Sequence, residues 1–71
     1  MDEYSRILIE QYCMKHSSKK SLRLGALLNL SYNMDAEPTD DDAIFLENAI
    51  LSEKNLQLKE ALQELDVFLF G

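Results

Sequence analysis

The stretch DAEPTDDD at residues 35–42 divides the chain and decides its fold class. Pro38 lacks an amide donor and pushes the residue before it toward extended backbone, so a helix cannot easily pass through this point. Thr39 then has the position of an N-cap, with Asp42 three residues later as in a capping box. Carboxylates in the first turn are stabilised by the helix dipole. The stretch therefore predicts that one helix ends before it and another begins at residue 40.

Upstream of this boundary, apolar residues recur with helical spacing in two segments. The first covers residues 3–15, and His16 with two following serines separates it from a second helix over residues 19–33. The second segment is apolar around most of its circumference, which predicts the central helix of the fold. Gly25 lies in its middle and costs about 1 kcal/mol relative to alanine. We expect this glycine to mark a close approach of two helices rather than a kink.

Downstream of the boundary, one unbroken helix over residues 40–69 would be about 45 Å long, which is longer than so small a domain is wide. Apolar residues recur every seven positions through this part, as in a short coiled-coil seam: Ile44, Leu51, Leu58 and Leu65. Lys54 and Asn55 interrupt the apolar positions. This interruption favours a break within residues 52–55, although one bent helix is the alternative.

These boundaries predict an all-α fold, a small antiparallel bundle of three to four helices forming one domain over residues 1–71. The helices are expected over residues 3–15, 19–33, 40–51 and 56–69, and the last two could instead be one bent helix. Apolar residues make up 46% of the chain and charged residues 28%, which is a globular balance. A domain of this size hides only about 60% of its unfolded surface, so we expect a thin core.

The residues that usually carry chemistry are scarce. Cys13 is the single cysteine and His16 the single histidine, which excludes an internal disulfide and leaves a zinc site incomplete. No motif places a nucleophile or carboxylate beside His16, and Cys13 has the position of a small core residue. We therefore expect no catalytic residue, no metal and no cofactor, and no small-molecule substrate.

Location follows from the same composition. The apolar runs are far shorter than the roughly 18 residues that a membrane span needs, and the acidic start does not resemble a secretory signal. A lone cysteine suits a reducing compartment. We expect a cytoplasmic protein that is not embedded in a membrane.

Charge is divided unevenly along the chain, whose formal net charge is −6. Residues 1–34 hold five basic and three acidic side chains, a net charge of +2, whereas residues 35–71 hold two basic and ten acidic ones, a net charge of −8. Most of such a surface repels polyanions, so nucleic acid is not an expected partner. The acidic half suggests one alternative function, a decoy that occupies the basic groove of a nucleic-acid-binding protein.

The end of the chain carries the main functional prediction. Residues 67–70 are four consecutive large apolar residues, which point in every direction from a helix end. Packing within one chain can hardly cover them all, so either the other helices wrap this end or another chain does. The predicted partner-binding residues are Leu58, Leu62, Leu65, Phe68, Leu69 and Phe70. We expect a non-catalytic protein-interaction module, a small regulator, adaptor or chaperone-like protein, that binds a protein partner or a second copy of itself.

The string QELD at residues 63–66 resembles the terminal part of the Ser-Gln-Glu-Leu-Asp signature of the small helical-hairpin aspartyl-phosphate phosphatases of sporulating bacteria. Leu62 stands where that signature has its serine, and the remaining residues do not follow the two-helix pattern of the family. The resemblance implies that Asp66 would act on the phosphoaspartate of a response regulator. This phosphatase activity is a further alternative function.

Overall fold

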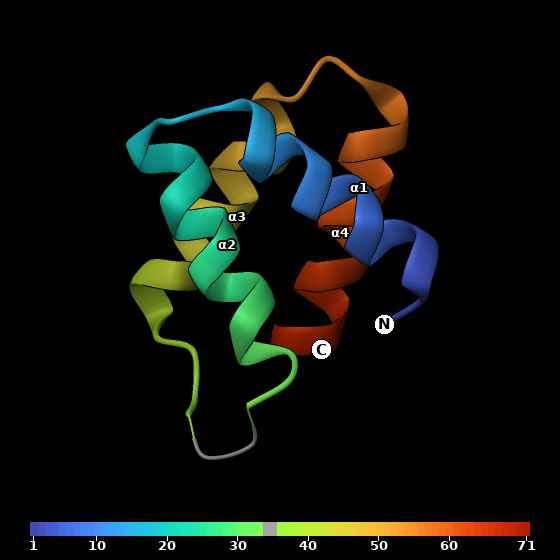
Figure 1. Ribbon diagram of the computed structural model, residues 1–71. Helices are drawn as coiled ribbons and strands as arrows, with labels where there is room; N and C mark the ends of the chain where they lie inside the picture. Colours follow the sequence, from blue (N-terminus) through green and yellow to red (C-terminus); the bar gives the residue numbers. More distant parts are fainter. Residues whose placement is uncertain (34–35) are drawn as a thin grey trace.

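Residues 1–33 and 36–71, which the computed structural model describes, form four α-helices and contain no β-strand. The helices are α1 (Glu3–Lys15), α2 (Lys19–Leu30), α3 (Asp40–Ser52) and α4 (Leu56–Phe70), shown in Figure 1. The predicted all-α bundle is therefore confirmed. Three of the four helices agree with their predicted bounds to within one residue.

The exception is α2, which ends three residues before the predicted residue 33. The amide and the hydroxyl of Ser31 both donate to the carbonyl of Leu28, at 3.0 and 2.5 Å. Tyr32 then donates to the carbonyl of Asn29 instead of continuing the helical pattern. Because a serine side chain can replace helical backbone bonds in this way, the last turn tightens and the helix stops.

Each helix begins with a side chain that accepts a hydrogen bond from an otherwise unpaired backbone amide. These caps are Asp2, Ser18, Thr39 and Asn55, in chain order. The predicted capping box at α3 is present: Thr39 Oγ1 accepts from the Asp42 amide at 3.2 Å, and the Asp42 carboxylate accepts from the Thr39 amide at 2.9 Å. The start predicted at residue 40 is confirmed.

The predicted break between the last two helices is also confirmed. Residues 53–55 are not helical, and Glu53 has extended backbone with φ −77° and ψ 126°. The side chain of Asn55 accepts a hydrogen bond from the Leu58 amide at 3.1 Å. Asn55 therefore starts α4, and the alternative of one bent helix is excluded.

The helices form two layers, with α1 and α2 in front of α4 and α3 in Figure 1. α1 packs against both α2 and α4, and α4 packs against α3. α1 runs antiparallel to α4, since Ser5 near the start of α1 contacts Glu64 near the end of α4. Each of α1 and α4 packs against two neighbouring helices, whereas α2 and α3 each pack mainly against one. The prediction that residues 19–33 form the central helix is wrong, because α2 packs mainly against α1 and leaves Leu22 75% exposed.

All four helices contribute to the core. Its buried apolar residues are Ile9, Leu24, Leu27, Leu28, Leu46, Ala49, Leu58, Ala61, Leu62 and Leu65. Four of these belong to α4, which therefore contributes as much to the core as any helix. Burying a leucine side chain contributes about 1.5–3 kcal/mol.

Three of the residues predicted to bind a partner belong to this core. Leu58, Leu62 and Leu65 are 8%, 0% and 0% exposed, so the prediction that they face another chain is wrong. The cause is the break at residues 53–55, which lets α4 turn back along the bundle. The apolar stripe of α4 then packs inside its own chain rather than on the outside of a long helix.

Candidate interaction surfaces

The C-terminal turn, residues 67–70, is the part of the predicted binding surface that remains available. Val67, Phe68 and Phe70 are 66%, 52% and 37% exposed, and Leu69 is half-buried against the core. Successive residues of a helix point about 100° apart, so these side chains surround the helix end instead of forming one flat patch. The exposed members of the prediction are thus Phe68 and Phe70, with Leu69 at their edge.

A second apolar surface lies between α1 and α2, where no site was predicted. A groove of about 690 Å³ runs along the two helices and is called the α1/α2 groove here. Its apolar lining consists of Cys13, Met14, Leu22, Gly25, Ala26 and Leu28. Met14 and Leu22 are 85% and 75% exposed, the largest fractions for a large apolar residue within residues 1–33 and 36–71.

Gly25 and Cys13 face each other across this groove. A β-carbon added at Gly25 would lie 3.9 Å from the Cys13 sulfur, which is ordinary van der Waals contact. The expected close approach of two helices is therefore not tight enough to require glycine, and the missing side chain instead leaves room in the groove. Burial and the nearby Glu10 carboxylate raise the pKa of the Cys13 thiol, which keeps it protonated and poorly nucleophilic at neutral pH.

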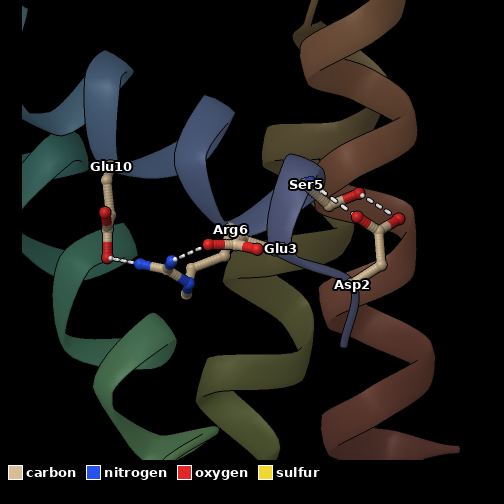
Figure 2. Close-up of polar contacts among 5 residues, drawn as sticks. All are labelled: Asp2, Glu3, Ser5, Arg6 and Glu10. Carbon is tan, nitrogen blue, oxygen red and sulfur yellow. Dashed lines mark hydrogen bonds and ion pairs between the residues drawn. The ribbon is translucent and has the colours of Figure 1, made fainter.

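The two ends of the groove differ in charge. Because α1 and α2 run antiparallel, Glu10 and Asn29 line one end, and His16 lies at the other. Figure 2 shows the side chain of Arg6 between the carboxylates of Glu3 and Glu10, at 3.4 and 2.8 Å. With two carboxylates and one guanidinium this end is negative. The opposite end is followed by Lys19, one helical turn before Leu22.

Polar residues between α1 and α4 serve to hold the fold. The Ser5 hydroxyl, which is buried, donates to Glu64 at 2.6 Å, and the Asp2 amide donates to the same carboxylate at 2.6 Å. Figure 2 also shows Ser5 beside the Asp2 carboxylate that caps α1. A hydrogen bond from the Ser5 amide lowers the pKa of Asp2 below its usual value. The Glu64 carboxylate thus ties the start of α1 to α4, while the Asp2 carboxylate caps α1.

These contacts bear on the string at residues 63–66. Its Glu64 is engaged with Ser5, Leu65 is fully buried, and Asp66 is half-buried. Of the four residues, Gln63 is the exposed one. The string is therefore divided between the core and the helix surface, and its Glu64 carboxylate accepts hydrogen bonds from the Ser5 hydroxyl and the Asp2 amide.

Three basic residues, Lys19, Lys20 and Arg23, lie in the first half of α2, and one of them contacts the acidic start of α3. Arg23 lies 3.4 Å from the Asp42 carboxylate and stacks over the Phe45 ring, with 4.5 Å from its guanidinium carbon to the ring centroid. Lys20 lies over the Tyr12 ring at 5.8 Å. Two of the cations therefore contact aromatic rings of their own chain.

Within the described ranges 1–33 and 36–71, no group of three or more His, Cys, Asp or Glu side chains is placed to hold a metal ion. A search of the same residues finds no helix with the length and apolar content to cross a membrane. Comparisons with protein families, with curated proteins and with solved structures give no match to this chain. The C-terminal turn and the α1/α2 groove are two exposed apolar surfaces of the described residues.

Proposed function

We propose that this chain is a non-catalytic protein-interaction module, a small regulator, adaptor or chaperone-like protein, that binds another protein through its C-terminal turn. One observation carries the proposal: Val67, Phe68 and Phe70 stay exposed although α4 already supplies four residues to the core. Large aromatic side chains commonly dominate binding energy when a partner encloses them. A cytoplasmic setting would keep the lone Cys13 reduced.

The surroundings of the C-terminal turn indicate the chemistry of the partner. Residues 35–71 have a net charge of −8, and Glu64 and Asp66 lie one turn before the exposed side chains. Complementary charge favours encounter and orientation more than it adds affinity. The partner that fits best presents an apolar hollow bordered by lysine or arginine.

Affinity capture with paired variants tests this proposal. The chain, immobilised through its N-terminus, is exposed to lysate of the cell that encodes it, beside a Val67→Ser/Phe68→Ser variant and an Ile44→Ser/Leu51→Ser variant. Ile44 and Leu51 are 57% and 70% exposed on α3, so the second variant removes similar apolar surface elsewhere. We expect a protein retained by the wild type and the α3 variant, and lost from the C-terminal variant.

Circular dichroism confirms that both variants fold, since none of the four positions belongs to the core. Equal retention by all three chains, or none by the wild type, would overturn the proposal. A salt series separates the decoy alternative, because binding through exposed carboxylates weakens steeply with ionic strength and apolar contact does not.

A further inference from the structure

We propose that a second copy of this chain docks in the α1/α2 groove, about a twofold axis perpendicular to it. The contact would use the outward face of α1 and α2, with the C-terminal turn left free for the partner proposed above. The inference therefore goes beyond the proposed function, and either can fail without the other.

The shape of this face is self-complementary. Leu22 projects from α2, while Gly25, one turn further along the same helix, leaves room beside the Cys13 sulfur. A twofold interface places the same patch on both copies, so a projection and a hollow on one face can each receive the other. Met14 on α1 and Ala26 on α2 extend the apolar contact on either side of the groove.

The distribution of charge favours a contact between two copies on this face rather than on the acidic half of the molecule. Residues 35–71 carry a net charge of −8, so a contact between two copies there would oppose many carboxylates. Residues 1–34, which form both walls of the groove, carry a net charge of +2. Of the two halves, this one can therefore approach a copy of itself without strong repulsion.

The opposite ends of the groove also match under the proposed symmetry. Glu10 lines one end, and its carboxylate is 42% exposed even while it contacts Arg6. Lys19 is exposed at the first residue of α2, three residues after His16, which lines the other end. A twofold axis through the middle of the groove exchanges its ends, and each Glu10 then approaches Lys19 of the second copy. This charge complementarity is what commits the groove to a second copy rather than to an unrelated helix.

Sedimentation and light scattering of the full chain over a dilution series test the proposal, from about 1 mM down to 1 μM, the range of weak to moderate affinity. We expect the mass to approach twice the 8.2 kDa of one chain at high concentration. Leu22→Glu should weaken dimerisation about tenfold or more, because it places a charge at the centre of the contact. Leu51→Glu is the matched control, since Leu51 is 70% exposed on α3, and it should leave dimerisation unchanged.

A charge exchange tests the symmetry itself. Glu10→Lys and Lys19→Glu should each weaken the dimer about threefold, the size of the effect of an exposed ion pair, and the double variant should recover the wild-type affinity. A Val67→Ser/Phe68→Ser variant should dimerise like the wild type. A strict monomer at every concentration, dimerisation unaffected by Leu22→Glu, loss of the dimer in the C-terminal variant, or no recovery in the double variant would each overturn the proposal.

Discussion

The two halves of one seven-residue repeat have opposite surroundings in this molecule. Ile44 and Leu51 on α3 are 57% and 70% exposed, whereas Leu58 and Leu65 on α4 are 8% and 0% exposed. The spacing between all four is the same, and it would form one stripe only on a continuous helix. The three residues of the break change the direction of the chain, so the repeat continues in the sequence but not in space.

The comparison teaches that exposure alone does not identify an interface. The outward face of α3 carries Ile44 and Leu51 among Asp40, Asp41 and Glu47, which are all exposed. These carboxylates keep that face hydrated and repel a second acidic chain. The face of α1 and α2 has similarly exposed apolar residues, but they border a groove of about 690 Å³, whereas the hollow beside Ile44 is about 350 Å³. Shape and charge therefore separate a surface suited to docking from one suited to water.

The largest expected effect is the loss of stability when a buried leucine of the repeat is shortened. Leu65→Ala removes a fully buried side chain and should lower the free energy of unfolding by about 2–5 kcal/mol. Leu51 lies two heptads earlier in the same repeat. Leu51→Ala should change the free energy of unfolding by no more than about 0.5 kcal/mol. Urea unfolding followed by circular dichroism measures both. Similar losses in the two variants would mean that the repeat packs as one seam after all.

Helix boundaries were predictable because their causes are local. Pro38 disfavours a helix that passes through it, and Thr39 fixes the start of α3 through hydrogen bonds with Asp42, three residues later. The polar residues 54 and 55 mark the break. The end of α2 was predicted three residues late because the Ser31 hydroxyl competes with the backbone there. A serine at that position does not by itself say which bond its side chain will make.

The binding surface was less predictable because it depends on how helices pair. The amphipathic pattern of α4 predicts that Leu62 is buried. It does not say whether residues of the same chain or of a partner bury it. The α1/α2 groove depends on which side of α2 turns away from α1. Its signals were Gly25 and the excess of apolar residues around α2, which predicted a central helix and instead reflect a second exposed face.

A smaller loss of stability is expected at the break between α3 and α4, where Asn55 caps α4. Asn55→Ala removes the cap of α4 and should cost about 0.5–2 kcal/mol, because the Leu58 amide loses its acceptor. Asn55→Asp keeps an oxygen in the same place and should retain most of the stability. Urea midpoints of the three chains make the test, and an aspartate variant as unstable as the alanine variant would show that capping is not the role of Asn55.

The smallest effect concerns acid, which should weaken the start of α3 before the start of α4. The hydrogen bond from the Thr39 amide, with a contribution from Arg23, lowers the pKa of Asp42 below its ordinary value of 3.8. A carboxylate with a lowered pKa stabilises the folded state fully above that ordinary value, and this contribution is lost as the pH falls through the lowered pKa. Asn55 does not titrate, so the α4 cap persists.

Amide hydrogen exchange between pH 5 and 2, an interval that brackets the ordinary aspartate pKa, measures this difference. After correction for the intrinsic pH dependence of exchange, amides in the first turn of α3 should lose protection by a few tenths of a kcal/mol, the size of an exposed interaction with the helix dipole. Amides in the first turn of α4 should lose less. Asp42→Asn keeps an acceptor oxygen without a titrating group, so it should reduce the acid dependence at α3. Equal loss at both helices, or an unchanged acid dependence in Asp42→Asn, would mean that the charge of Asp42 does not stabilise the start of α3.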